Sequence, residues 1–548
     1  MGTRRALHSA PMTVPLGMET FAVHRTLKPA TETREYALLR IRAAASLDGP
    51  APRLSVVLVL DASGSMAGEP ITQVIQSTRR LAEILGDTDS LGVVVFAAGA
   101  GTVAPLQTLT RQARHDVQSA ASRITAGGGT NMSGGMAHGA LLYPARGDDE
   151  RQVMIVLSDG QPNIGAATPE LLSAEAKRIR ERGVSISTLG FGKHHSDDVM
   201  VALADAGGGR YAFINDPRLA AQNFARALGA QRDVVAESVS LTLTPGEGVE
   251  ILRVFGDPPT SFGSGGLKVS LQDLVMGDEL NVVVELKLRA PGREGPWVAL
   301  GATLTARATG TREAVTLPMD VTIAVASDGG GELEPVAVVA SAVALADDTR
   351  AKARACAERK DFRGAVALLK EARQALIDTP GYRKGSDDPL DDAVESLTDE
   401  ITALEKTPTE NEYNEYKKAA RDYLDFGQSG TKTRGSSNLA FQSPSMMAIS
   451  AKMNVIVPEA YLVVVNGERA GERLRLTEEN DIGRGVGVKV RVASPAVSRR
   501  HATVVFNQND WWVIDMRTTN GTRHNGAQVE RARLAHGDVI EVGGTVFR

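Results

Sequence analysis

A short acidic and hydroxyl-rich stretch that follows an apolar run constrains this chain most. Residues 54–60 (Leu-Ser-Val-Val-Leu-Val-Leu) are mostly apolar and rich in valine, which predicts a strand buried on both faces. Asp61, Ser63 and Ser65 come next, where a parallel strand hands over to a helix. Their oxygen atoms can turn toward one point, and hard oxygen donors suit Mg²⁺ or Mn²⁺ rather than zinc. Taken alone, this pattern also fits an ordinary turn that caps the next helix.

Two distant stretches favour the metal interpretation. Residues 127–131 (Gly-Gly-Gly-Thr-Asn) form a glycine-rich loop that presents the hydroxyl of Thr130. Residues 153–160 form a second buried-type strand that ends at Asp159. Asp-x-Ser-x-Ser, then Thr, then Asp therefore occur in order, each beyond a strand or in a loop.

This order resembles the metal-ion-dependent adhesion site (MIDAS) of the von Willebrand factor A (VWA) family, over roughly residues 52–232. The resemblance implies a Mg²⁺ or Mn²⁺ site with five ligand positions: Asp61, Ser63, Ser65, Thr130 and Asp159. It also implies that the three hydroxyls coordinate the metal directly and that the two carboxylates act largely through water. One position then stays open for an acidic group from a partner.

Composition excludes several classes of protein. A chain of 548 residues holds several domains, and its net charge of −5 predicts no bulk attraction to nucleic acid or membrane. The single cysteine, Cys356, excludes an internal disulfide framework and fits a reducing cytosol. No run of about 18 apolar residues occurs, so we expect no transmembrane segment and a cytoplasmic location.

Alternation of apolar and polar residues predicts a β-sandwich that the VWA domain interrupts. Residues 1–18 are expected to be a flexible N-terminus, and residues 19–51 contain strand-like segments that need partners elsewhere. Residues 236–326 supply such partners, separated by turns rich in Pro and Gly. We expect one antiparallel sandwich, split by the inserted VWA domain at 52–232.

Within the inserted domain, strands and helices alternate, which predicts a doubly wound parallel α/β sheet. The expected strands are near residues 54–60, 91–96, 152–158, 184–189 and 210–214, and the expected helices are near residues 69–86, 112–124, 134–143, 169–182, 197–206 and 217–231. Ligands of such sheets bind beyond the carboxyl ends of the strands. Asp61 and Asp159 both follow strand ends, as a binding site there requires.

The next segments are expected to be helical and then unstructured. Residues 333–425 predict a helical bundle of four helices, the last near 410–423, and the bundle is either a spacer or a protein-binding surface. Residues 426–458 are rich in Gly, Ser, Thr, Gln and Pro, which is typical of a flexible linker.

Residues 461–548 contain short alternating strands and three distinctive loops. The loops are Ile482-Gly483-Arg484, Val497-Ser498-Arg499-Arg500-His501 and Thr519-Asn520-Gly521-Thr522. Together, in this order, they resemble the forkhead-associated (FHA) domain, an all-β sandwich that reads phosphothreonine.

The FHA resemblance implies roles for seven residues. A guanidinium such as that of Arg484 offers a fixed fork to phosphate oxygens. The residues expected to bind the phosphopeptide are Arg484, Ser498, Thr519 and Asn520, and those expected to shape the loops are Gly483, His501 and Gly521.

The motifs favour recognition over catalysis. The sequence contains no G-x-S-x-G motif, no P-loop and no set of kinase motifs. We therefore expect a non-enzymatic scaffold that binds an acidic partner through the metal and a threonine-phosphorylated protein through the FHA domain. Bacterial Ser/Thr kinase and phosphatase signalling is the expected setting. An adaptor for an AAA+ ATPase is the alternative, and a metal-dependent hydrolase is disfavoured because the site lacks a general base.

Overall fold

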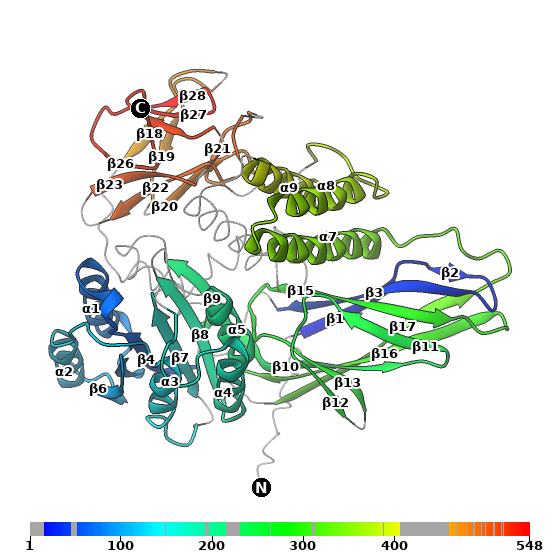
Figure 1. Ribbon diagram of the computed structural model, residues 1–548, viewed down its shortest axis with the longest axis horizontal. Coiled ribbons are helices and arrows are strands. Elements are labelled where there is room, and N and C mark those ends of the chain that lie inside the picture. The colour runs from blue at the N-terminus through cyan, green and yellow to red at the C-terminus, as the bar shows by residue number, and fades with distance from the viewer. Residues whose placement is uncertain are drawn as a thin grey trace, which may run out of the picture.

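The computed structural model describes residues 16–44, 52–147, 150–159, 161–191, 197–214, 231–263, 265–309, 313–386, 388–405 and 460–548, the last range without residues 468, 478, 486–487, 495, 499, 508–509, 517 and 519. Figure 1 shows an α/β domain beside a β-sandwich, a helical region along the sandwich, and a separate C-terminal β domain. The expected linker at 426–458, the expected helices near 217–231 and 410–423, and nearly all of the expected N-terminal segment lie outside the described residues.

Six strands form the sheet of the α/β domain. In spatial order they are β6 (Ala100–Thr108), β5 (Ser90–Phe96), β4 (Arg53–Asp61), β7 (Glu150–Ser158), β8 (Val184–Phe191) and β9 (Gly208–Ile214). All neighbours are parallel except β6, which runs antiparallel to β5. The expected sheet was entirely parallel, and β6 differs because its short connection to β5 permits only a hairpin.

Helices cover both faces of this sheet. They are α1 (Glu69–Ile84), α2 (Arg111–Ala121), α3 (Met132–Ala140), α4 (Pro169–Glu181) and α5 (Asp197–Gly207). Apolar side chains of α1 and α2 pack into one core, and those of α3, α4 and α5 pack into the other. The chain reverses its winding between β4 and β7, so the carboxyl ends of these two strands border the crevice where ligands of doubly wound sheets bind.

The β-sandwich combines strands from both sides of the α/β domain. One sheet has the order β1 (Leu16–Ala22), β3 (Glu32–Ala43), β15 (Glu279–Arg289) and β11 (Val249–Val254). The other has the order β12 (Thr260–Gly263), β13 (Gly266–Ser270), β10 (Val234–Pro245), β16 (Gly295–Ala308), β17 (Ala314–Val325) and β2 (Thr26–Leu27), with β14 (Leu274–Val275) beside β10. Strand β3 pairs with β15 along its whole length, and one apolar core fills the space between the sheets.

A buried ion network joins the α/β domain to the sandwich. Arg151, at the start of β7, is 1% exposed. Its guanidinium donates to Gln231 at 3.0 and 2.8 Å, to Glu237 at 3.1 Å and to Asp273 at 2.7 Å. Arg146 adds a second bond to Glu237 at 2.9 Å. Because Glu237 and Asp273 belong to the sandwich region, these bonds fix one domain on the other.

Three helices follow the sandwich: α7 (Pro335–Glu358), α8 (Phe362–Ile377) and α9 (Pro389–Glu405). The alanines at 337, 340 and 344 of α7 pack against Leu38 and Val283 on the outer face of the four-stranded sheet. Arg253 of that sheet also pairs with Asp348 of α7 at 2.9 Å. Within the described part of the chain, no helix is long and apolar enough to cross a membrane.

The C-terminal domain is entirely β. One sheet has the order β21 (Val490–Arg491), β20 (Glu479–Gly483), β22 (Ala502–Asn507), β23 (Asp510–Asp515) and β26 (Arg531–Leu534). A second has the order β25 (Ala527–Val529), β24 (Thr522–His524), β27 (Ile540–Val542) and β28 (Thr545–Phe547), and β18 (Tyr461–Val463) pairs with β19 (Arg473–Arg475). Side chains of these strands enclose one apolar core.

The Arg151 network yields a stability prediction. Replacement Arg151→Ala removes the nearest cation to the buried Asp273 and one of the two arginines that pair with the buried Glu237, so we expect a loss of about 3–5 kcal/mol in the free energy of unfolding. Urea unfolding of the full-length chain measures this loss. Arg178→Ala is the matched control, because Arg178 is 71% exposed and pairs only along its own helix. Equal unfolding curves for the two variants would contradict the prediction.

Candidate functional site

Asp61 is a buried carboxylate fixed at the carboxyl end of β4. It is 0% exposed. One oxygen, Oδ1, accepts the backbone N–H of Ser63 at 2.8 Å, and Oδ2 accepts the hydroxyl of Ser158 at 2.5 Å. These bonds hold the carboxylate in a single orientation at the crevice between β4 and β7.

Hydroxyl groups connect this region to Asp159 at the end of β7. The Oγ atoms of Ser63 and Ser65 lie 3.1 Å apart, and Ser65 donates to Oδ1 of Asp159 at 2.7 Å. Ser65 lies in the short 3₁₀ helix Gly64–Met66, and Ser63 directly precedes this helix. Four of the five predicted ligand residues therefore form one continuous contact chain.

Backbone hydrogen bonds place the loop of Thr130 against the serine loop. Gly127 N–H donates to the carbonyl of Ala62 at 2.7 Å, and Gly64 N–H donates to the carbonyl of Gly128 at 3.1 Å. Gly128 has a φ of +86°, a left-handed conformation that favours glycine. The structure thus brings together the segments that carry all five predicted residues.

Two supporting residues were missed by the sequence analysis. Ser158 binds Asp61, and its position directly before Asp159 gave the one available signal. Asn163 accepts the N–H of Thr130 at 2.8 Å and donates its own N–H to the carbonyl of Thr130 at 3.0 Å. Nothing in the sequence distinguishes Asn163 from an ordinary turn asparagine.

The electrostatics of this edge suit a cation. Burial raises the pKa of the Asp61 carboxyl, hydrogen bonds from Ser158 and Ser63 oppose that shift, and the charge of Asp159 adds to it. Among the described residues, no group of three or more His, Cys, Asp or Glu side chains could hold a metal ion. A metal at this edge therefore depends on hydroxyl groups and water as well as on two carboxylates, which is typical of Mg²⁺.

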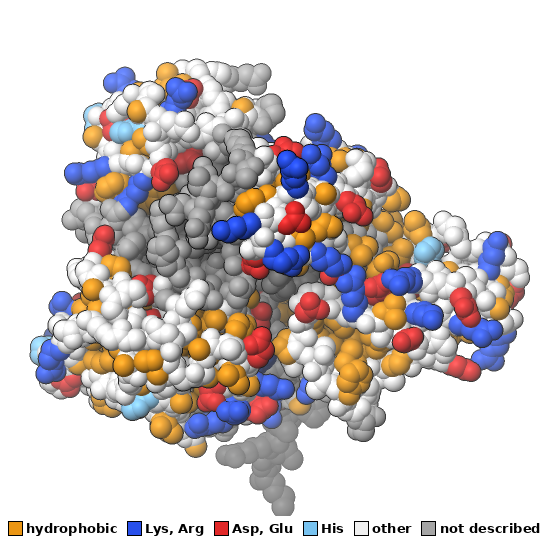
Figure 2. Space-filling model, viewed as in Figure 1, with side chains coloured by type: hydrophobic (Ala, Val, Ile, Leu, Met, Phe, Trp, Pro, Cys, Tyr) orange, Lys and Arg blue, Asp and Glu red, His pale blue; other side chains and the backbone are white. Residues whose placement is uncertain are grey.

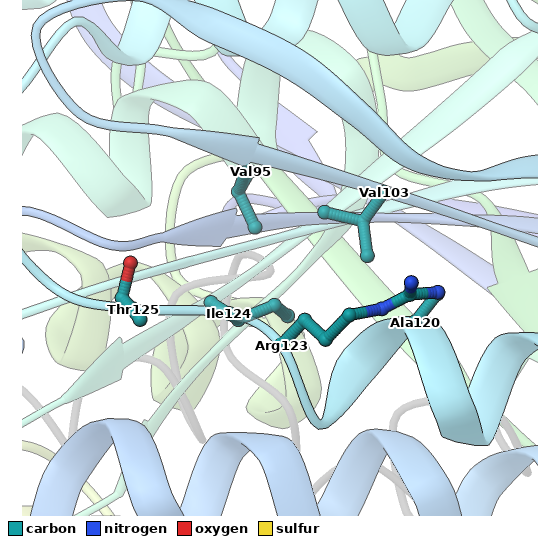
Figure 3. A pocket seen from close by; sticks show the side chains of 6 residues that line it. All are labelled: Val95, Val103, Ala120, Arg123, Ile124 and Thr125. Carbon is teal, nitrogen blue, oxygen red and sulfur yellow. The ribbon is translucent and has the colours of Figure 1, made fainter.

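The shallow pocket in Figure 3 is a different feature. It has a volume of about 320 Å³ and lies between β5, β6 and the segment after α2. Its lining residues are Val95, Val103, Ala120, Arg123, Ile124 and Thr125. It contains none of the predicted ligand residues.

In the C-terminal domain, the imidazole of His501 connects the distinctive loops. This side chain is fully buried. Its Nδ1 accepts the N–H of Ser498 at 3.2 Å, so the ring proton belongs on Nε2, which lies 3.0 Å from the carbonyl of Gly521. Thr518 Oγ1 is also 3.0 Å from Nε2. The loops that carry Ser498 and Gly521 are therefore held at one end of the domain.

The predicted peptide-binding residues surround this brace. Arg484 follows Gly483 at the end of β20, and the backbone N–H of Arg484 donates to the carbonyl of Ser498 at 3.1 Å. Asn520 is exposed and donates to the carbonyl of Ala496 at 2.7 Å. Gly521 has a φ of +67°, and an added Cβ there would lie 2.2 Å from the side chain of Gln528. Thr519 lies outside the described residues.

The Arg484 guanidinium faces the helical region. Its Nη2 atom forms an ion pair with Glu395 of α9, and the two side chains are 22% and 26% exposed. Its Nε atom is buried and has no hydrogen-bond partner among the described residues. The guanidinium thus has donor capacity left for a second acceptor.

Comparisons with known families agree with both sequence motifs. The family model of the von Willebrand factor type A domain matches residues 55–226, and that of the FHA domain matches residues 480–543. The chain therefore contains a VWA domain and an FHA domain, which confirms the two resemblances and the multidomain fold class.

Two similar bacterial proteins each align with only part of this chain. An uncharacterised protein of Synechocystis sp. is 32% identical over 209 residues, 37% of this chain and 48% of that protein. An uncharacterised protein of Escherichia coli (strain K12) is 27% identical over 217 residues, 38% of this chain and 36% of that protein. This chain thus spans less than half the length of either relative.

A solved structure supports the fold over a longer region. A von Willebrand factor type A protein from Catenulispora acidiphila aligns with a TM-score of 0.53 at 19% identity, covering 72% of this chain and 91% of that chain. At this identity the likeness shows the fold alone. Its coverage exceeds residues 55–226, so the shared architecture extends beyond the VWA domain.

Replacement of Asp61 separates the cost of its buried charge from metal binding. In EDTA, Asp61→Asn is expected to be at least as stable as the wild type, because burial penalises the charged carboxylate and an amide can keep the bonds to Ser63 and Ser158. With Mg²⁺ about 100-fold above its Kd, the wild type should gain about 2–3 kcal/mol, and the variant should gain nothing. Thermal unfolding with and without Mg²⁺ measures both effects. A Mg²⁺-dependent gain in the variant would exclude Asp61 from the metal site.

Loss of the His501 brace should weaken the C-terminal domain. His501→Ala removes a buried ring and leaves the N–H of Ser498 without its acceptor, so we expect a loss of about 2–4 kcal/mol. Hydrogen exchange of β22 and β24 in the full-length chain reports the change. His536→Ala is the control because His536 is exposed in a turn. Unchanged protection in the His501 variant would show that the imidazole does not brace the loops.

Proposed function

We propose that this chain, with its VWA and FHA domains, is a non-enzymatic scaffold that binds two kinds of partner. The observation that carries the proposal is the convergence of hydroxyl and carboxylate oxygens at the β4–β7 edge, together with the buried carboxyl of Asp61. That edge offers oxygen ligands to a cation, and no histidine or lysine of the described residues forms a hydrogen bond with Asp61. It is therefore suited to binding rather than to proton transfer.

At the β4–β7 edge, five residues would hold Mg²⁺ or Mn²⁺, in two different ways. Ser63, Ser65 and Thr130 would coordinate the ion directly, and Asp61 and Asp159 would act largely through water. The bound ion would supply a Lewis-acidic position for a carboxylate of an acidic protein partner. The chain's own part is to fix these oxygens, which the bonds to Ser158 and Asn163 do.

At the FHA domain, the ligand is a threonine-phosphorylated protein. Arg484 and Ser498 would bind the phosphate, Thr519 would add a contact, and Asn520 would hold the peptide backbone. Gly483, His501 and Gly521 would keep the loops in shape, which agrees with the bonds of the buried imidazole.

The setting that fits both sites is cytoplasmic Ser/Thr kinase and phosphatase signalling in a bacterium. Bacterial relatives and the phosphothreonine-reading domain support this setting. Nucleic acid is not an expected partner, because the net charge is −5. On the face in Figure 2, acidic and basic side chains are also interspersed.

The two binding functions should be separable by mutation. We expect Arg484→Ala to weaken binding of a fluorescein-labelled library with a central phosphothreonine and randomised flanks by about 10-fold or more, because charge-assisted hydrogen bonds are lost. Asp61→Asn should leave that binding unchanged and abolish the Mg²⁺-dependent, EDTA-sensitive capture of protein partners. Fluorescence anisotropy and affinity capture with the full-length chain are the measurements.

Arg469→Ala is the matched control in the same domain, because Arg469 is half exposed and pairs with Glu472. Equal binding of phosphorylated and unphosphorylated libraries would contradict the phosphothreonine function. Capture that persists in EDTA would contradict the metal-dependent one.

A further inference from the structure

The arginine assigned to phosphate recognition already holds an acidic group of the same chain. Glu395 lies in the second turn of α9, 89 residues before Arg484, and its Oε2 pairs with Nη2 of Arg484. Figure 1 shows α9 beside the β20–β21 end of the C-terminal domain, where Arg484 follows β20. The contact therefore joins the helical region to the phosphopeptide-binding loops.

We propose that Glu395 is an internal competitor that masks the phosphothreonine-binding site until a phosphorylated partner displaces it. The proposal rests on the proposed function of the FHA domain and adds its regulation. In the masked state α9 covers the Arg484 loop. In the bound state the phosphate pairs with the guanidinium of Arg484, and the ion pair between Arg484 and Glu395 of α9 is broken.

The chemistry of Arg484 favours such an exchange. The carboxylate of Glu395 carries one negative charge and pairs through Nη2, whereas the buried Nε has no hydrogen-bond partner within the described ranges. A phosphothreonine carries about −1.5 to −2 charges and three acceptor oxygens. It can bind Nε and Nη2 together in the two-bond geometry that arginine prefers. The ion pair between Glu395 and Arg484 should therefore be weaker than the contact between phosphothreonine and Arg484.

The neighbourhood of Glu395 is acidic, as a mimic of a phosphopeptide requires. Asp388, Asp391 and Asp392 precede it at the start of α9. Asp391 is 0% exposed, and in the part of the chain that the structure describes neither of its carboxylate oxygens has a hydrogen-bond partner. Burial raises the pKa of the Tyr382 hydroxyl, and the negative charges of Asp391, Glu395 and Asp388 raise it further. These three carboxylates therefore lie close enough to Tyr382 to act on the same hydroxyl.

The competitor sits on a rigid support. Leu390, Leu397 and Ile401 of α9 are buried in the core that it shares with α7 and α8. The first half of α7 is packed on the sandwich. Because Glu395 and Arg484 belong to one chain, the carboxylate competes at an effective concentration of about a millimolar. A single contact of modest strength is then sufficient to reduce the affinity for an external ligand.

The test compares peptide affinities of full-length variants. The probe is the fluorescein-labelled phosphothreonine library, measured by anisotropy at constant ionic strength. Glu395→Gln removes the charge with little change in size, and we expect a Kd about three- to tenfold lower than that of the wild type. Glu395→Lys should lower the Kd further, because a lysine repels Arg484.

Glu405→Gln is the matched control, because Glu405 is on the same helix and pairs with Lys370. Its Kd should equal that of the wild type. As a second readout, addition of the library should increase the radius of gyration of the wild type in X-ray scattering, and Glu395→Lys should show the larger radius without peptide.

The outcomes distinguish this inference from the proposed function. Equal Kd values for the wild type, Glu395→Gln and Glu395→Lys would overturn the masking role and leave phosphothreonine binding intact. Failure of every form to bind the phosphorylated library would overturn the phosphothreonine function and the masking role with it. A lower Kd in the Glu405→Gln control as well would show a general charge effect and would also overturn the specific role of Glu395.

Discussion

The buried guanidinium of Arg151 is the interaction on which the arrangement of domains depends. It pairs with acceptors of the sandwich region at one end of β7, and Asp159 lies just beyond the other end of the same strand. Nine residues of extended chain span about 30 Å. A central strand of a packed sheet does not bend easily. A displacement of residues at the β4–β7 edge can therefore be transmitted along β7 to the sandwich.

The same structure connects the two proposed binding sites to this rigid unit in different ways. The β4–β7 edge belongs to the unit, because its residues extend directly from β4 and β7. The FHA domain is connected to it through α7, α8 and α9, with the Glu395–Arg484 ion pair as a polar link. The β4–β7 edge is therefore built into the body of the protein, whereas the FHA domain is joined to it by a contact between two half-buried side chains.

Features encoded by local patterns could be predicted from the sequence, and features that depend on distant partners could not. Runs of buried-type residues predicted β4 and β7, and the polar residues after them predicted that Asp61, Ser63, Ser65 and Asp159 lie together, whereas the metal itself stays a prediction. Strand β6 was missed because Gly101 and Pro105 give it the composition of a loop. The roles of Asn163, Arg151 and Glu395 depend on residues 33, 86 and 89 positions away, as the bonds to Thr130, Glu237 and Arg484 show. No periodicity records such pairs.

The position of β3 has a consequence for synthesis of the chain. Tyr36 of β3 pairs with Glu285 of β15, so this central strand waits for a partner made about 250 residues later. At about 5–20 residues per second, that delay is roughly 12–50 s, during which the α/β domain can already fold. One edge of β3 can pair with β1, but the edge that pairs with β15 stays open throughout this time, and open strand edges associate readily with other chains. Completion of the sandwich is therefore the step at which a nascent chain of this kind most needs protection by chaperones.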